Sequence, residues 1–202
     1  EKDHVRKTEG NKTFLIWKSI VISKEIKIIF LLGVNVFFLS HGLGGWMPEI
    51  LREHIGFSSM AASNWTAASL GIGILISLLL PSRTRRENFS FILTSLLLVI
   101  VLSLIAIIFL PSYMTPVSVM IAGSRSALIP LVILALMESP KLNIKQMGTA
   151  YGLWFASAEI GGVLGPVTAG RMADSTFGYD GVLWLMVAVC LMMILLAYAL
   201  RI

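Results

Sequence analysis

The chain has 202 residues, of which 56% are hydrophobic and only 13% are charged, and its mean hydropathy is +0.86. Soluble domains carry about 25% charged residues, so this composition excludes a soluble globular domain, and it equally excludes a disordered, collagen-like or coiled-coil chain. The single cysteine, Cys190, excludes an intramolecular disulfide framework and a cysteine-rich metal site. We therefore expect a membrane protein, and we expect neither a metal nor a cofactor.

Six segments are apolar over a length that suits a membrane-spanning helix, which needs about 20 residues. They run over residues 26–47, 61–80, 89–110, 116–137, 147–169 and 182–200. The connections are short and rich in proline, glycine, serine and charge, which predicts antiparallel neighbours. We expect an all-α fold with a cytoplasmic tail and amphipathic approach segment over residues 1–25, followed by a six-helix transmembrane bundle over residues 26–202.

Basic residues are distributed unequally between the two sides of this bundle. Only Arg52 and Arg171 fall outside if the N-terminus is inside, and Arg125 lies within a span. The other thirteen fall on the inner side: Lys2, Arg6, Lys7, Lys12, Lys18, Lys24, Lys27, Arg83, Arg85, Arg86, Lys141, Lys145 and Arg201. Because cytoplasmic loops carry the excess of lysine and arginine, we predict that both termini are inside. Sidedness explains the net charge of +5, so no nucleic-acid partner is expected.

The character of the spans repeats after the third. The first and fourth contain polar residues, the second and fifth are rich in small residues, and the third and sixth are almost purely aliphatic. This order predicts two three-helix inverted repeats, in which the first members line a pore and the third members face lipid.

Small residues recur at every fourth position of the fifth span, at Ser157, Gly161, Gly165 and Ala169. Such a stripe lets the backbone of another helix approach closely, so we expect it to be a packing surface. Two prolines, Pro130 in the fourth span and Pro166 in the fifth, lack an amide hydrogen and are expected to kink their helices.

The sequence GGVLGPVTAG at residues 161–170 resembles the G-x-x-x-G-P-x-x-G-G helix motif of the major facilitator superfamily, with Ala169 in place of one glycine. The loop SLLLPSRTRREN resembles a worn copy of that superfamily's G-x-x-x-D-R-x-G-R-R loop. Only its last two arginines remain, and we interpret them as topology-setting residues. The stretches GGWMPEIL, SALIPL and MGTAYGLWFASAEIGGVLGP look most like the cyanate-permease-type branch. The motif residues are Gly161, Gly165, Pro166, Gly170, Arg85 and Arg86.

The resemblance covers residues 14–202 and implies the C-terminal half, helices seven to twelve, of a twelve-helix transporter. Its partners would be membrane lipid, a small-molecule substrate and the N-terminal half of the same protein, which would supply the other wall of the substrate path. We expect a secondary transporter that moves a small organic or inorganic anion by alternating access with proton coupling. A drug or multisubstrate efflux carrier and a non-transporting six-helix scaffold are the alternatives. The expected location is a prokaryotic cell (inner) membrane.

Arg125 lies roughly 13 to 18 Å from either end of the fourth span, near the midplane. Intramembrane ionisable residues usually face the bundle interior and often mark a substrate path. Glu159, at similar depth in the next span, is the candidate partner. Two hypotheses remain open: Arg125 binds an anionic substrate while Glu159 takes a proton, or the two form a permanent structural ion pair.

Four other polar or aromatic residues complete the candidate site. Asn35, Asn64 and Trp154 are predicted to bind substrate, with packing as an equally good interpretation of Trp154. His41 is a candidate proton relay, with a hydrogen-bonded structural histidine as the alternative.

An intramembrane hydrolase is the enzyme class to weigh against transport. Ser124 follows a glycine, but a serine nucleophile needs an adjacent base. The three histidines, His4, His41 and His54, all precede it in the chain, and no His-Glu-x-x-His motif occurs. We therefore do not expect an enzyme.

Overall fold

The computed structural model describes residues 23–200. Residues 1–22, which include the predicted tail and most of the approach segment, lie outside the described residues, as does Arg201. The described part of the chain contains helices and short connections but no strand.

Each of the six segments predicted from the sequence is helical. The first runs as α2 (Lys24–Glu49) and continues as a π turn, η1 (Ile50–His54). It is followed by α3 (Ser59–Arg83), the 3-10 turn η2 (Arg86–Asn88), α4 (Phe89–Phe109), the 3-10 turn η3 (Ser112–Met114), α5 (Thr115–Ala122), the 3-10 segment η4 (Gly123–Ala127), α6 (Leu128–Met137), α7 (Ile144–Ala173) and α8 (Gly178–Ala199).

Five stretches of the described chain are long and apolar enough to cross a membrane: Lys24–His54, Ser59–Arg83, Arg86–Phe109, Ser112–Met137 and Gly178–Ala199. Helix α7 is the longest helix but is not among them, because its glycines and Glu159 dilute its apolar character. The chain is thus an all-α, multi-pass integral membrane protein.

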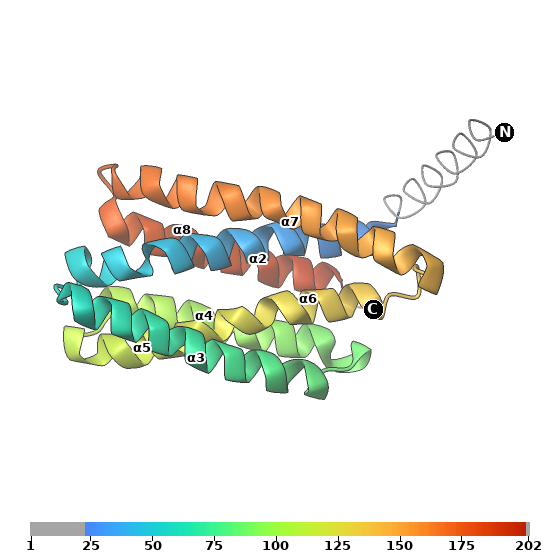
Figure 1. Ribbon diagram of the computed structural model, residues 1–202, viewed down its shortest axis with the longest axis horizontal. Helices are drawn as coiled ribbons and strands as arrows, with labels where there is room; N and C mark the ends of the chain where they lie inside the picture. Colours follow the sequence, from blue (N-terminus) through green and yellow to red (C-terminus); the bar gives the residue numbers. More distant parts are fainter. Residues whose placement is uncertain (1–22, 201–202) are drawn as a thin grey trace.

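The helices run antiparallel along one long bundle (Figure 1). The start of α2 and the α3–α4 and α6–α7 connections lie at one end, and the other connections lie at the opposite end. The first end carries the basic residues Lys24, Lys27, Arg83, Arg85, Arg86, Lys141 and Lys145, whereas Arg52 and Arg171 lie at the other. We refer to these as the basic end and the opposite end.

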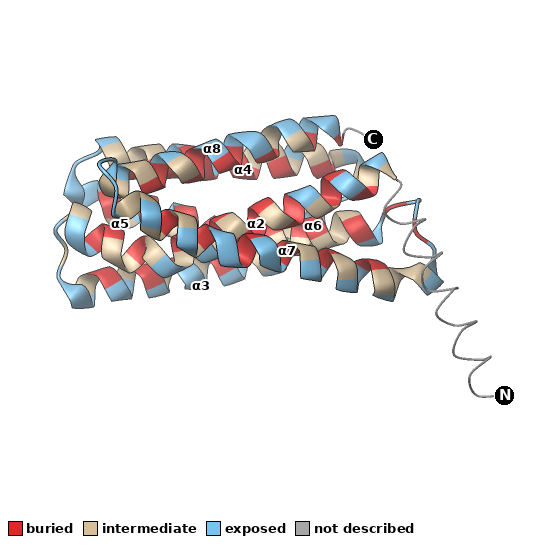
Figure 2. Ribbon diagram, turned by 90° about the horizontal axis from the view of Figure 1, so that it is seen from above, coloured by how far each residue is buried: buried red, intermediate tan, exposed pale blue. Residues whose placement is uncertain are grey.

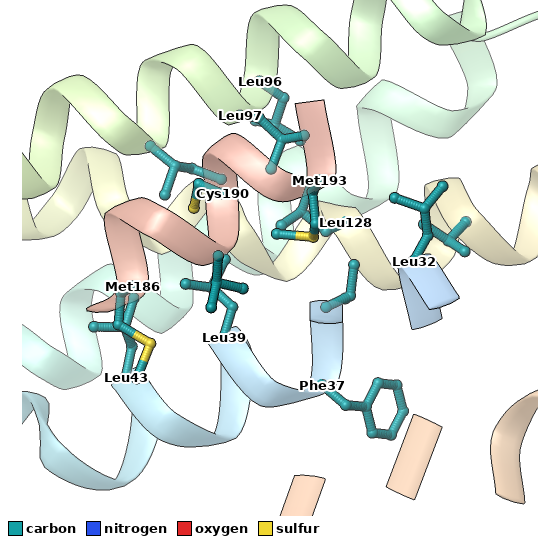
Figure 3. Close-up of a cluster of buried hydrophobic side chains, with 14 of the residues drawn as sticks. Leu32, Phe37, Leu39, Leu43, Leu96, Leu97, Leu128, Met186, Cys190 and Met193 are labelled. Carbon is teal, nitrogen blue, oxygen red and sulfur yellow. The ribbon is translucent and has the colours of Figure 1, made fainter. Parts of the chain in front are cut away.

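Helix α2 is the most enclosed element of the described chain, since it packs against α7, α8, α6 and α3. Its side chains Leu39 and Leu43 lie beside Met186 and Met193 of α8, and Leu97 of α4 covers the far side of α8 (Figure 3). The outward faces of the other helices are largely exposed (Figure 2). Because lipid is as apolar as these side chains, this core is held by close van der Waals packing.

Glycines bring α7 against α2. A Cβ atom added at Gly161 would collide with the backbone of Val34, and one added at Gly165 would collide with the backbone of Phe38. Ala169, the next member of the stripe, is fully buried. The predicted close packing of this stripe is confirmed, and its partner is α2.

Helix α3 meets η4 in the same way. An added Cβ atom at Gly73 would collide with the Gly123 carbonyl, and one at Gly123 would collide with the backbone of Ser69. Only the small residues on this face of α3 therefore allow close packing against η4. Gly71 does not contribute, because it faces open space.

The fourth segment, in which the sequence predicted a kink at Pro130, contains a 3-10 segment just before that proline. Pro130 has no amide hydrogen to donate to the Ser126 carbonyl, and the turn just before it, η4, is a 3-10 helix between α5 and α6. Pro166, in contrast, lies inside α7, which is one uninterrupted helix.

Candidate functional site

Arg125 is buried in η4, with 2% of its surface exposed. Its Nη1 donates a hydrogen bond of 3.3 Å to the carbonyl of Ala122, one turn earlier. Its Nη2 reaches toward α2, where it lies 3.9 Å from the position a Cβ atom of Gly44 would take. Pro48 cannot donate to the carbonyl of Gly44, so backbone polarity is exposed on the same stretch of α2. Within the described chain, no carboxylate lies within ion-pair distance of Arg125.

Two buried hydroxyls lie on the elements that carry and face this guanidinium, η4 and α2. Ser124, its neighbour in η4, is 3% exposed, and its Oγ has no hydrogen-bond partner among the described residues. The Oγ of Ser40 is likewise buried and unpartnered. Ser40 precedes Gly44 by one helical turn, on the face of α2 that Arg125 approaches. The arrangement presents a guanidinium and unsatisfied hydroxyls in a setting where polar groups normally pair.

Glu159 does not pair with Arg125. Its residue is exposed on α7, while Arg125 is enclosed in η4. The two hairpin neighbours α6 and α7 touch at only a few positions, because both pack mainly elsewhere and α2 contacts each of them. The hypothesis of a permanent ion pair therefore has no geometric basis in the structure.

Glu159 instead lies beside His41 of α2, on either side of Gly162. A Cβ atom at Gly162 would lie 3.0 Å from Oε2 of Glu159 and 3.5 Å from Nδ1 of His41. That Nδ1 lies 3.0 Å from the carbonyl of Phe37, which assigns the proton to Nδ1 and leaves Nε2 as an acceptor. Pro166 cannot donate to the carbonyl of Gly162, so this carbonyl also lacks its helical donor. The carboxylate of Glu159 and the imidazole of His41, which can each carry a proton, therefore lie near each other on the exposed surface of α2 and α7.

The remaining predicted substrate residues lie apart from Arg125, and no hydrogen bond in the described chain joins them to it. Asn35 is buried and donates to the carbonyl of Leu31 in its own helix at 2.7 Å. Asn64 is exposed on α3. Trp154 is fully buried, and its Nε1 donates to the carbonyl of Ile29 at 3.1 Å. This burial favours the packing interpretation of Trp154.

The motif residues of α7 line its contact with α2. Trp46 donates from Nε1 to the carbonyl of Pro166 at 3.0 Å, and a Cβ atom at Gly170 would lie 2.8 Å from the same ring. Gly170 therefore leaves room for Trp46. The sequence patterns do not indicate this contact, because Trp46 is also typical of a membrane-interface residue.

Arg86 connects three elements at the basic end. Its Nη1 donates to the carbonyl of Glu138 at 3.2 Å, and its Nη2 lies 3.8 Å from Oε1 of Glu25. Ser139 donates to the same Glu25 oxygen at 2.8 Å. Arg85 has a local role, since its backbone amide donates to Asn88. The sequence pattern indicates a topology-setting role for both arginines but does not predict the contact of Arg86 with Glu25 at the start of α2.

No family model and no curated protein matches this sequence. Among residues 23–200, no three histidine, cysteine, aspartate or glutamate side chains gather as a metal site would require.

Proposed function

We propose that this chain is the C-terminal six-helix half of a secondary active transporter of the major facilitator superfamily, and that it moves a small organic or inorganic anion by alternating access. The proposal includes two inverted three-helix repeats and an orientation with both ends inside. The motif resemblance at residues 161–170 and the gathering of basic residues at one end of the bundle support it.

The proposal of an anionic substrate depends on one observation: Arg125 is buried without a carboxylate partner among the described residues. An arginine at mid-membrane costs about 2.5 to 3.5 kcal/mol even on lenient insertion scales. A bound anion would offset this cost, and the guanidinium offers a fork that suits carboxylates and related oxyanions. The unpartnered hydroxyls of Ser124 and Ser40 are further donors for such an anion.

The test uses the full-length protein reconstituted in proteoliposomes, with a radiolabelled panel of cyanate, nitrate, small carboxylates and cationic drugs. We expect uptake of one anion class, and we expect Arg125→Ala to weaken it by roughly tenfold to a hundredfold, as for the loss of one charged hydrogen-bond pair. Arg125→Lys keeps the charge and should lose less. Arg171→Ala removes an exposed arginine at the opposite end and serves as the control.

Parental uptake by Arg125→Ala would remove the anion site from this residue. Uptake of cationic drugs alone would favour the drug-efflux alternative.

We further propose that Glu159 and His41 couple transport to protons. Their shared position beside Gly162 supports this, because a carboxylate and an imidazole on the same side of the α2–α7 contact can exchange a proton through one intervening water. Glu159→Gln should abolish proton-driven accumulation and spare exchange.

A steric variant tests the same pair without changing any charge. Gly162→Ala places a methyl group 3.0 Å from Oε2 of Glu159, whereas Gly152→Ala, on the same helix, meets nothing within 4 Å. We expect the first to lose accumulation and the second to retain it. Equal accumulation by both variants across the pH range would contradict the coupling role.

A further inference from the structure

A groove with a volume of about 400 Å³ lies between the start of α4 and the end of α8, at the basic end of the bundle. Neither the proposed anion site nor the proposed proton pair uses it. Its walls come from Arg86, Ser90, Phe91 and Thr94 on one side, and from Ile194 and Tyr198 on the other.

The groove changes from polar to apolar along its length. Arg86, Ser90 and the ring of Tyr198 lie toward the end of the bundle, and Thr94 and Ile194 lie one turn deeper on their helices. Beyond them the exposed surface of α4 and α8 is hydrocarbon, with Leu98 at 47% and Leu191 at 48% exposure. A molecule that fits both parts must itself have a polar head and an apolar chain.

The excess of basic residues at this end of the bundle favours a ligand whose polar head is negatively charged. Seven basic residues there, Lys24, Lys27, Arg83, Arg85, Arg86, Lys141 and Lys145, outnumber the acids Glu25, Glu87 and Glu138. Glu87 lines the groove itself. Arg86 is 32% exposed, its Nη1 donates to the carbonyl of Glu138 at 3.2 Å, and its nearest acid oxygen is at 3.8 Å. The five N–H donors of a guanidinium therefore exceed the partners that Arg86 has among the described residues.

We propose that this groove binds one anionic phospholipid, with the phosphate against Arg86 and Ser90 and an acyl chain along Phe91, Thr94 and Ile194. A guanidinium and neighbouring hydroxyls recognise a phosphate, and basic pockets between membrane helices hold anionic headgroups. The apolar continuation of the groove separates this ligand from a free phosphate ion, which would fill only its polar end.

Native mass spectrometry of the detergent-purified full-length protein tests the proposal. The protein is titrated with palmitoyl-oleoyl phosphatidylglycerol, its phosphatidylcholine analogue, or inorganic phosphate. We expect one phosphatidylglycerol to bind in preference to phosphatidylcholine, and we expect excess inorganic phosphate not to displace it.

Two matched pairs of variants locate the site. Arg86→Gln should weaken retention of phosphatidylglycerol about fivefold, the effect of one near-surface cation, whereas Arg85→Gln removes an adjacent exposed arginine outside the groove and should change it little. Thr94→Trp should block the groove without any change of charge. Leu102→Trp, on the same helix but outside the groove, is its control.

Three results would each overturn the proposal. Equal effects of Arg86→Gln and Arg85→Gln would mean only general attraction to anionic lipid. Displacement by inorganic phosphate would mean a soluble-anion site. Undiminished lipid retention by Thr94→Trp would place the lipid elsewhere.

Discussion

Gly161 lies where the backbones of α7 and α2 touch, so the absence of a side chain there decides how near the two helices come. An added methyl group would collide with the backbone of Val34, which cannot yield as a flexible side chain would. At Gly152, on the opposite face of the same helix, nothing lies within 4 Å of the position an added Cβ atom would take. The two glycines have the same effect on helix propensity but opposite packing environments.

Gly161→Ala is therefore expected to destabilise the protein by about 1 to 3 kcal/mol, the usual cost of overpacking. Gly152→Ala should be neutral or stabilising by up to about 1 kcal/mol, because alanine favours the helix. Thermal unfolding in detergent measures both. Equal melting temperatures for the two variants would contradict the close contact of α7 with α2.

Trp154 offers a second prediction at this scale. Because its ring is fully buried and its Nε1 donates to Ile29, Trp154→Phe should lower the free energy of unfolding by about 1 kcal/mol, the value of one hydrogen bond. The KM for substrate should stay at the parental value. A raised KM with unchanged stability would instead support the predicted contact between Trp154 and substrate.

At the scale of single elements, α7 begins earlier than the apolar pattern indicates. The sequence predicted a start near Met147, whereas the helix starts at Ile144. Asn143 and Gln146 form a capping box, in which each side chain accepts from the other's backbone amide at 3.1 Å. The spacing of asparagine and glutamine was visible in the sequence and would have located this start.

We expect Asn143→Ala to cost about 1 kcal/mol and to fray the first turn of α7, because the backbone amide of Gln146 loses its acceptor. Hydrogen exchange of the amides from Ile144 to Met147 measures this directly. Asn143→Asp should keep the cap and the protection. If the alanine variant exchanges no faster than the parent, the cap does not hold this turn.

At the scale of the whole molecule, the proposed orientation can be tested with the native cysteine in place. Cys190 is fully buried, so it should not react with a membrane-impermeant maleimide. Ser82 and Ser175 are exposed, one beside the basic end and one in the α7–α8 connection at the opposite end. A cysteine introduced at Ser82, in the last turn of α3, or at Ser175 reports the side of the membrane on which that end of the bundle lies.

We expect Ser175→Cys to be labelled from outside intact cells, and Ser82→Cys only in inverted membrane vesicles. The reverse result would invert the orientation that the basic residues predict. Labelling of both positions from one side would contradict a bundle whose connections alternate between two sides.

Composition and periodicity determined much of this protein without coordinates. The membrane class, the six helical segments, the packing stripe at Gly161 and Gly165 and the irregularity near Pro130 all follow from rules that act within one helix. Such rules state which residues share a face of a helix. They need only the nearby sequence, because helical hydrogen bonds join residues that are four positions apart.

Only the tertiary structure decided which helix covers each face. Adjacency in sequence suggested that Arg125 and Glu159 would meet, but α7 packs on α2, so Glu159 lies beside His41 and Arg125 approaches Gly44. Among apolar helices in lipid, hydropathy does not distinguish one neighbour from another. The choice depends on where backbones can touch, as at Gly161 with Val34 and at Gly123 with Ser69, and that fit exists only in three dimensions.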